Sequence, residues 1–307
     1  MANVVADFGE LSRALAVLEA RIAILVGLLR VVPDRVPGKT RLGRMLLRPF
    51  LSRSPCILTD RAGCTYVLPS YAEPIAQHIF TFGAYERDTQ EVILRFLPKR
   101  GTLIDVGANI GALAIPIAKA RPHASIICLE ADPNIHELLV ENVIRNECGR
   151  IQVVSCIAGP ADSQFVPFYR APDDKFGMGS IGPQFGAHPI MLAQRSLDVL
   201  VADSNLADVD VIKIDVEGAE FGVLQGARRI LASKRPPAIV FEFADWAEGR
   251  IPGQRPGDSQ SLLLASGYRL FRLEPGPRIG AEIVTPLRNG ACMLLALPPH
   301  MTVPFPP

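Results

Sequence analysis

The sequence predicts an α/β fold of the Rossmann-like class, in which helices cover both faces of a mostly parallel sheet. From Gly101 onward, short apolar runs alternate with segments of helical periodicity, which is the pattern of a sheet built from strand–helix units. A glycine-containing turn, Asp105–Gly111, follows the first of these apolar runs. Hydrophobic residues make up 49% of the 307 residues, which argues for a large core and against a disordered chain.

Seven strands and four helices are expected in this part of the chain. The strands are expected at residues 102–106, 126–130, 151–156, 209–215, 238–243, 268–273 and 291–297. The helices are expected at residues 111–120, 133–146, 217–231 and 259–266. The stretch from Gly159 to Arg195 carries many Gly and Pro residues and is expected to be irregular.

The chain is predicted to have three parts. Residues 1–55 hold an amphipathic helix and a basic segment, residues 56–100 a hairpin and a helix that lead into the core, and residues 101–300 the main α/β domain. The hairpin is expected over residues 57–68 with its turn at Asp60–Gly63, and the helix at residues 86–97.

The N-terminal helix carries one apolar seam and stops near Pro33. The pattern favours docking on the main domain or homodimerisation over contact with a membrane surface. Glu19, Arg21 and Arg30 interrupt the apolar stretch, so a transmembrane helix is disfavoured, and no secretory signal is expected. A basic run follows, and loose attraction to anionic lipid or an anionic acceptor is compatible with it. The seam is formed by Leu11, Leu15, Leu18, Ile22, Leu25, Leu29 and Val32, and the run by Arg35, Lys39, Arg41, Arg44, Arg48 and Arg53.

Net charge and cysteine usage exclude several classes of function. The formal net charge is +1, with 32 basic against 31 acidic residues, so no nucleic-acid partner is indicated. The six cysteines contain no C-x-x-C pair, so a zinc site is not expected. Cysteines in or beside apolar strands are typical of buried thiols, which suggests a reducing, cytoplasmic setting.

The first two predicted strands indicate a cofactor site at their carboxyl ends, where ligands bind in such sheets. Gly107 allows the backbone to turn close to a ligand, and Gly111 allows close packing of helix on strand. Asp105 could hold the amino-acid part of a cofactor. Glu130 ends the second strand and could accept hydrogen bonds from both hydroxyls of a ribose.

The glycine spacing distinguishes two adenosine-containing cofactors. A dinucleotide site requires G-x-G-x-x-G, so that the pyrophosphate can lie against backbone N–H groups. This chain has D-x-G-x-x-x-G instead, from Asp105 to Gly111. The leading carboxylate would repel a pyrophosphate but suits S-adenosylmethionine, which is cationic and has no phosphates. A purely structural role for the two glycines and Glu130 is the alternative.

The segment from Val211 to Glu220 indicates a reacting centre, because an apolar strand runs there into an acidic helix start. Lys213 and Asp215 share one face of the strand, and the buried lysine needs a partner, for which Asp215 is nearest. Asp215 is expected to orient an acceptor hydroxyl or take its proton. For Glu220 a structural role at the helix N-terminus is favoured.

Two further residues are candidates for acid–base chemistry. His188, in the Gly/Pro-rich stretch, is the best-placed histidine, although an isolated loop histidine is more often inert. Glu242 ends the fifth strand along the chain. Asp215 and Glu242 together could hold a divalent cation, but such sites normally use more oxygen ligands, so no metal is predicted.

Together these motifs resemble the FkbM family of methyltransferases. The resemblance covers about residues 80 to 297 and rests on two separate motifs in the right order. It includes Tyr85-Glu86, Asp105-Val-Gly-Ala-Asn-Ile-Gly111, Glu130-Ala-Asp-Pro-Asn134, Glu141-Asn142, Asn146, Ser196-Leu-Asp198, Lys213-Ile-Asp-Val-Glu-Gly-Ala-Glu220, Leu224, Gly226-Ala227 and Glu242.

The resemblance implies a seven-stranded sheet whose last strand is antiparallel. It also implies S-adenosylmethionine-dependent O-methylation of sugar or polyketide hydroxyls. The cofactor-binding residues are then expected to be Glu86, Asp105, Gly107, Asn109, Gly111, Glu130 and Ala131, and the catalytic candidates Asp215, Glu217, Glu242 and His188. The chain departs from the family at Glu130-Ala131-Asp132-Pro133, where many relatives run Glu-Pro directly, so the loop there is expected to shift. The Gly159–Arg195 stretch matches loosely and is expected to form the acceptor pocket.

Two other classes of function compete with this hypothesis. An NAD-type oxidoreductase is disfavoured because G-x-G-x-x-G is absent. A non-catalytic binding module is disfavoured because the site residues are intact.

Methylation of nucleic acid is disfavoured because no basic stripe with interleaved aromatics is present. N-methylation is disfavoured because Asp-Val-Glu stands where an Asn/Asp-Pro-Pro-aromatic turn would be expected.

Overall fold

The computed structural model describes residues 24–29, 31–33, 36–47, 55–172, 175–186, 188–204, 206 and 208–303. Contacts between α-carbons group the chain into two compact units. The first comprises Met1–Gly63 and Leu68–Tyr85, and the second Cys64–Val67 and Glu86–Pro307. The predicted part boundaries at residues 55 and 100 stay predictions.

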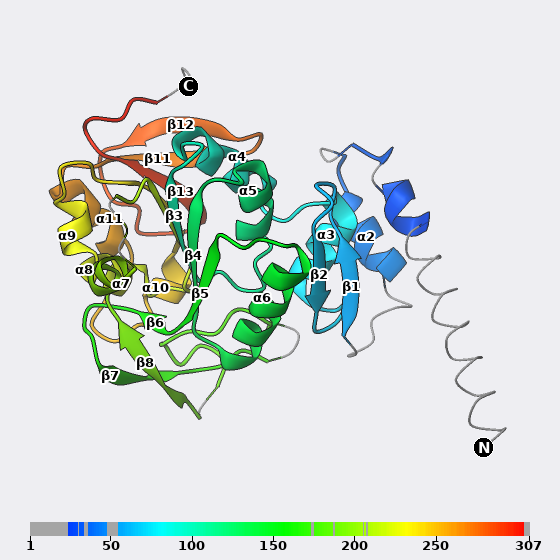
Figure 1. Cartoon of the computed structure of the whole chain (residues 1–307), viewed down its shortest axis with the longest axis horizontal. Coiled ribbons are helices and arrows are strands. Elements are labelled where there is room, and N and C mark those ends of the chain that lie inside the picture. Colours follow the sequence, from blue (N-terminus) through cyan, green and yellow to red (C-terminus); the bar gives the residue numbers. More distant parts are fainter. Residues whose placement is uncertain are drawn as a thin grey trace. The chain divides into compact units, whose positions relative to one another are not determined.

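The second unit contains an eight-stranded sheet that confirms the predicted fold class (Figure 1). The strand order is β12-β11-β13-β10-β9-β3-β4-β5, and β10, β9, β3, β4 and β5 run parallel to one another. All seven predicted strands are present. They are β3 (Thr102–Val106), β4 (Ser125–Glu130), β5 (Ile151–Ser155), β9 (Val211–Ile214), β10 (Ala238–Ala244), β11 (Arg269–Glu274) and β13 (Ala291–Leu297).

The eighth strand, β12 (Arg278–Ile283), extends the sheet at one edge. It pairs antiparallel with β11, which in turn pairs antiparallel with β13. The prediction of seven strands missed β12 because only one of its six residues is buried, and an edge strand with little burial lacks the apolar pattern by which strands are recognised. The antiparallel pairing of β13 with β10 agrees with the expected reversal at the end of the chain.

Helices lie on both faces of this sheet (Figure 1). One group contains α4, α5 and α6, and the other α7, α8, α9 and α11. Their bounds, together with those of α10, are α4 Arg87–Phe96, α5 Ala114–Ala120, α6 Pro133–Arg145, α7 Leu197–Asp203, α8 Glu220–Gln225, α9 Arg228–Leu231, α10 Asp245–Glu248 and α11 Asp258–Ala265. The central strands are almost completely buried, as expected for parallel strands covered on both faces. Among the described residues, none of the helices is long and apolar enough to cross a bilayer.

Helix α6 begins as predicted, whereas the predicted helix over residues 217–231 is divided. Asp132 caps α6 by accepting a hydrogen bond from the Asn134 backbone N–H, with Pro133 in the first turn. α8 ends at Gln225, and α9 starts at Arg228. A β-carbon on Gly226 would lie 2.0 Å from the Gly159 carbonyl oxygen, so the close approach of another backbone requires glycine there.

The stretch predicted to be irregular contains two strands of a second, three-stranded sheet with the order β6-β8-β7, and β6 directly precedes it. Its strands are β6 (Ile157–Ala158), β7 (Gln164–Phe168) and β8 (Ile190–Arg195). The prediction of no regular structure between Gly159 and Arg195 was therefore wrong. Pro167 obscured β7 in the sequence, but an edge strand tolerates proline because its outer N–H positions need no partner.

The first unit contains α2 (Lys39–Leu47), α3 (Pro74–Phe82) and β1 (Cys56–Thr59). β1 and β2 (Thr65–Leu68) form a two-stranded sheet, which confirms the predicted hairpin. Gly43 lets α2 pack closely on α3, since a β-carbon there would lie 2.2 Å from the Thr81 hydroxyl oxygen. Residues 24–29 and 31 are helical, and the part of the predicted seam before Ile24 lies outside the described residues.

Candidate active site

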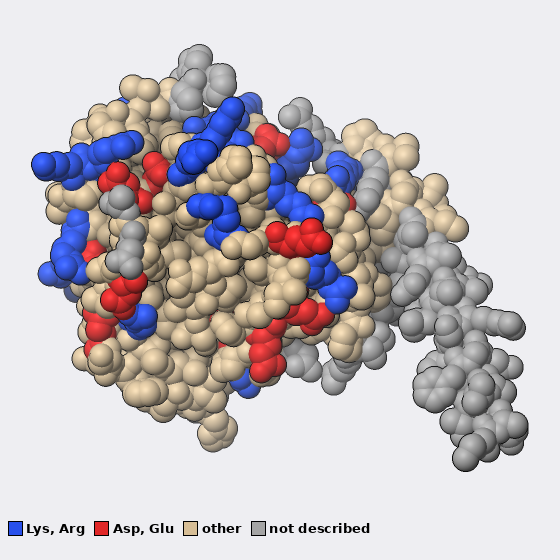
Figure 2. Space-filling view, in the orientation of Figure 1, with Lys and Arg blue, Asp and Glu red and all other residues tan. Residues whose placement is uncertain are grey.

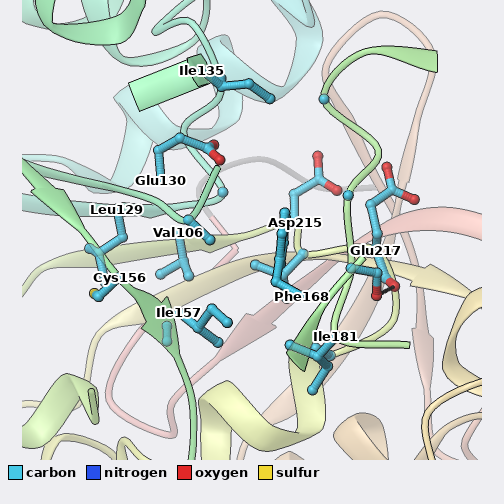
Figure 3. Close-up of a pocket in the computed structure, with 18 residues that line it drawn as sticks. Val106, Leu129, Glu130, Ile135, Cys156, Ile157, Phe168, Ile181, Asp215 and Glu217 are labelled. Carbon is cyan, nitrogen blue, oxygen red and sulfur yellow. Dashed lines mark hydrogen bonds between the residues drawn. The ribbon is translucent and has the colours of Figure 1, made fainter. Parts of the chain in front are cut away.

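A cavity lies at the carboxyl ends of β3, β4 and β9 (Figure 3). Its empty volume is about 580 Å³, part of it open to solvent. Five predicted site residues line it, namely Gly107, Glu130, Ala131, Asp215 and Glu217. The location confirms that the strand ends predicted from the sequence converge on one cavity.

Gly107 directly follows β3 and lines the cavity. Its φ is 78°, and a β-carbon at this position would lie only 1.9 Å from the backbone carbonyl oxygen of Asp215. The turn therefore requires glycine for both its left-handed conformation and the close approach of the neighbouring strand end. Gly111 also has a left-handed φ, 85°, and a β-carbon there would lie 2.8 Å from a methyl carbon of Leu139.

Glu130 is held at the cavity wall by backbone donors on both of its oxygens. Its Oε2 accepts a hydrogen bond from the Asn109 N–H and its Oε1 from the Asp132 N–H, both at 2.9 Å. A carboxylate has about four lone-pair directions, so each oxygen keeps capacity for one more donor. Burial raises the pKa of Glu130 to about 7, although both backbone donors oppose the shift.

Asp132, one of the two residues that separate Glu130 from Pro133 where many relatives run Glu-Pro directly, takes part in this arrangement. Its N–H donates to Glu130, its carboxylate caps α6, and the same carboxylate pairs with Arg170 at 2.9 Å. Asp132 therefore supports the position of Glu130 and links the loop after β4 to the segment that follows β7.

Asn109 lies in the turn after β3, and its side chain packs against the Gly-rich segment that follows β7. Its backbone φ is 52° and its side-chain oxygen accepts a hydrogen bond from the Ile110 N–H. A β-carbon on Gly177 would lie 2.0 Å from the Asn109 Nδ2. Strained, left-handed residues other than glycine often occur at functional sites, and Glu86, Asn109 and Glu217 are all of this kind.

Asp105 lies behind the cavity and is not one of the residues that line it. Its side chain is 0% exposed, neither carboxylate oxygen has a hydrogen-bond partner, and the Lys213 Nζ is 3.8 Å from its Oδ1. Burial raises the pKa of Asp105, and Lys213 opposes the shift. The Asp105 carboxylate thus faces a buried lysine, and its predicted contact with a cofactor stays a prediction.

Lys213 also binds Asp215, as the sequence predicted. Its Nζ donates a hydrogen bond to Asp215 Oδ2 at 3.2 Å. Burial by itself would lower the pKa of Lys213, but Asp215 and Asp105 outweigh burial and raise it. The ammonium group therefore stays charged and fixes one oxygen of Asp215 at the cavity wall.

Three carboxyl groups meet beside this lysine. One oxygen from each of Asp215, Glu217 and Glu242 lies within 4.8 Å of the others, and Figure 3 shows Asp215 and Glu217 side by side. Burial raises the pKa of Glu217 to about 7, and the negative charge of Asp215 contributes to the shift. Burial raises the pKa of Glu242 to about 9, and the negative charges of Asp215 and Glu217 contribute to the shift. The cluster can thus keep a proton near neutral pH and exchange it with a bound group.

Contacts from two other segments fix the turn that carries Glu217. The Glu217 carbonyl oxygen accepts hydrogen bonds from Ser180 Oγ at 2.8 Å and Gln184 Nε2 at 2.6 Å. Glu220 Oε1 accepts from the Val216 and Gly218 N–H groups. Glu220 therefore has the structural role that the sequence favoured.

Six predicted site residues are absent from the cavity lining, namely Glu86, Asp105, Asn109, Gly111, His188 and Glu242. His188 is exposed. Glu86 precedes α4 with a φ of 42°, and it is near enough to Lys213 and Glu242 to raise the pKa of both, after stronger influences from burial and other carboxylates. The catalytic assignment of His188 and the cofactor assignment of Glu86 stay predictions.

The family assignment follows from comparison with known proteins. The family described as the methyltransferase FkbM domain matches residues 105–270, which is more than half of the chain and includes the cavity. The chain belongs to the FkbM methyltransferase family. The resemblance inferred from the sequence motifs is thereby confirmed.

Similar proteins include other methyltransferases. This FkbM-family chain is 27% identical to methyltransferase sdnD of Sordaria araneosa over 199 residues, covering 55% of this chain and 74% of the relative. It is 27% identical to the 2-O-methyltransferase NoeI of Sinorhizobium fredii over 164 residues, covering 49% and 67%. A solved precorrin-6y C5,15-methyltransferase from Geobacter metallireducens has a TM-score of 0.38 at 14% identity, with coverage of 70% and 92%.

Most of the apolar lining of this FkbM-family site was not predicted from the sequence. Figure 3 shows Phe168 and Ile181 from the Gly/Pro-rich stretch in the cavity wall. The loose match of this stretch to the family suggested an acceptor pocket but could not identify individual side chains. Cys156 and Ile157 follow β5, and Ile135 lies in the first turn of α6. In the sequence these residues cannot be distinguished from ordinary core residues.

Proposed function

We propose that this FkbM-family protein is an S-adenosylmethionine-dependent O-methyltransferase. The proposed acceptor is a hydroxyl of a sugar, a glycan or a polyketide-type small molecule, and the proposed setting is the cytoplasm. The observation that carries the proposal is that Glu130 and Asp215 line one cavity. The printed name of NoeI, a 2-O-methyltransferase, supports oxygen as the accepting atom.

The residues present fit the cofactor. Glu130 keeps acceptor capacity for the two hydroxyls of a ribose, because only one hydrogen bond reaches each oxygen. The Gly107 turn lets the ligand approach the backbone. Leu129, Ile135, Cys156 and Ile157 give the same cavity apolar walls, which suit an adenine ring. When bound, S-adenosylmethionine supplies an electrophilic methyl group carried on a positively charged sulfur.

Asp215 is the proposed base for the acceptor. Its carboxylate lines the cavity while Lys213 holds one of its oxygens. The carboxylate orients the acceptor hydroxyl and takes its proton, which makes the oxygen a better nucleophile. Glu217 and Glu242 are close enough to share that proton. The apolar walls limit access of water to the reacting groups.

Isothermal titration tests the proposal, with S-adenosylmethionine and S-adenosylhomocysteine as ligands and NAD as the control ligand. We expect both adenosyl ligands to bind and NAD not to bind. Glu130→Gln should weaken their binding by about tenfold or more, because a charged acceptor and its hydrogen bonds are lost. Glu137→Gln, at an exposed position of α6, is the matched control and should leave the affinity unchanged. Absence of adenosyl binding by the folded protein would overturn the proposal.

A further inference from the structure

The helical residues 24–29 and 31 expose an apolar stripe. Ile24, Leu28 and Val31 are 64%, 62% and 82% exposed, and their spacing of four and three residues places them on one helix face. Leu29, on another face, is 1% exposed. A helix that is apolar on both faces is normally buried on both. The exposed face of this helix is therefore expected to contact a partner.

Helix α2, the next helix along the chain, also exposes apolar side chains. Leu42 and Met45 are exposed there, and so are Arg41 and Arg44. Lys39 holds the two helices together, since its Nζ donates a hydrogen bond to the Val32 carbonyl oxygen at 2.7 Å. We call the exposed side chains of residues 24–29, 31, 36 and α2 the N-terminal face.

Exposed apolar side chains concentrate on the N-terminal face. Half of the large hydrophobic side chains that are exposed among the described residues fall between residues 24 and 45. Isolated exposed apolar residues need no explanation, whereas a cluster marks a site of contact with a partner or a membrane. The six are Ile24, Leu28, Val31, Val36, Leu42 and Met45.

The charge of this part of the chain distinguishes between two candidate partners, a second copy of the chain and a negatively charged surface. From residue 24 to residue 55 the chain has seven basic residues and one acidic residue, Asp34. Arg41 and Arg44 form no ion pair with any described residue. A symmetric pairing with a second copy would bring this positive segment against itself, which like-charge repulsion opposes. A negatively charged surface is the complementary partner.

Outside residues 24–55 the sequence holds 25 basic and 30 acidic residues, because the whole chain has 32 and 31. On the face that Figure 2 shows, the basic and acidic side chains of the described residues are interspersed. The positive segment is therefore a local feature, and it coincides with the exposed apolar stripe.

We propose that the N-terminal face binds the surface of a bilayer that contains anionic phospholipid. Ile24, Leu28, Val31 and Met45 enter the boundary between headgroups and acyl chains, while Arg41 and Arg44 contact the phosphates. Apolar side chains beside basic ones are what interfacial helices use for this purpose. Contact with a membrane surface, which the sequence pattern alone disfavoured, gains support because the structure leaves this apolar stripe uncovered.

Co-sedimentation of the full chain with vesicles tests this inference independently of methyl transfer. We expect binding to vesicles of phosphatidylcholine mixed with phosphatidylglycerol, weaker binding at high salt, and little binding to phosphatidylcholine alone. Arg41→Gln/Arg44→Gln should weaken the partition roughly 30-fold, since each basic residue near an anionic surface contributes ~1 kcal/mol. Leu28→Gln/Val31→Gln should abolish most of the binding that remains at high salt.

Matched variants control for the loss of charge and of apolar surface. Arg228→Gln/Lys234→Gln removes two exposed basic residues elsewhere, and Ile144→Gln removes an exposed apolar side chain from α6; both should bind vesicles like the wild type. No binding to anionic vesicles, or equal loss in the control variants, would overturn the proposal. So would a dimer of the wild-type chain, seen by ultracentrifugation, that Leu28→Gln/Val31→Gln dissociates while leaving vesicle binding intact.

Discussion

The backbone carbonyl oxygen of Asp215 lies 1.9 Å from the point where a β-carbon on Gly107 would be. The turn after β3 and the end of β9 are thus in direct contact at the floor of the cavity. The residue proposed as base and the turn proposed to approach the cofactor therefore cannot move independently.

Gly107→Ala should consequently abolish binding of S-adenosylhomocysteine and destabilise the fold. Gly290→Ala is the matched control, because Gly290 also has a left-handed φ, 92°, but has no atom within 4 Å of a β-carbon. Both variants incur a conformational cost of about 1–2 kcal/mol, and only Gly107→Ala adds the clash. Titration calorimetry and thermal unfolding measure the two effects; equal behaviour of the variants would show that the contact does not matter.

Asp215→Asn should retain binding of S-adenosylhomocysteine and lose methyl transfer. The amide cannot accept the hydroxyl proton as a carboxylate does, and a positioned base contributes roughly 100-fold or more. Transfer of a labelled methyl group to a panel of glycans and polyketides would measure the loss. His188→Asn is the comparison and should remain active, because His188 is exposed and does not line the cavity. Full activity of Asp215→Asn, with loss in His188→Asn, would transfer the role of base to the histidine.

The stability of the protein should fall as the pH rises toward about 8. Burial raises the pKa of Glu220 to about 8 from an ordinary value of 4.5. Below the ordinary value both the folded and the unfolded chain hold the proton, and above it only the folded chain keeps it. The free energy of unfolding therefore decreases between about pH 5 and pH 8, at no more than about 1.4 kcal/mol per pH unit for one group.

Glu220→Gln should reduce this slope by the share of one group, since glutamine can still accept the hydrogen bonds of the Val216 and Gly218 N–H groups. Glu130, Glu217 and Glu242, whose pKa values are also raised, retain the rest of the slope. Denaturant unfolding at several pH values measures the slope. Glu137→Gln should retain the wild-type slope because its side chain is exposed. A slope that is the same in Glu220→Gln and in the wild type would remove Glu220 as its source.

Divalent cations should not stabilise the protein. Asp215, Glu217 and Glu242 offer one close oxygen each, whereas calcium takes six to eight oxygen ligands, and Lys213 already binds Asp215. Thermal unfolding with magnesium or calcium added, and with a chelator, tests this expectation. A saturable rise in melting temperature that Glu242→Gln abolishes would contradict it and establish a cation site.

The sequence by itself determined the sheet and the identity of the strand ends. The apolar runs of the central strands are long enough to be recognised because parallel strands are buried on both faces. The positions of Gly107, Glu130 and Asp215 followed from the same reasoning, since each lies at or just beyond the end of such a run. The family motifs then indicated methyl transfer, and the family model confirmed the membership.

Only the tertiary structure decided which of these residues reach the cavity. Asp105 and Glu130 are both acids at strand ends, yet Asp105 faces Lys213 in the interior and Glu130 faces the cavity. Alternation along a strand gives the face of each side chain but not what lies opposite it. The contributions of Phe168, Ser180 and Ile181 depend on how a stretch rich in glycine and proline folds back. Such contacts are fixed by packing between distant segments and leave no periodic pattern in the sequence.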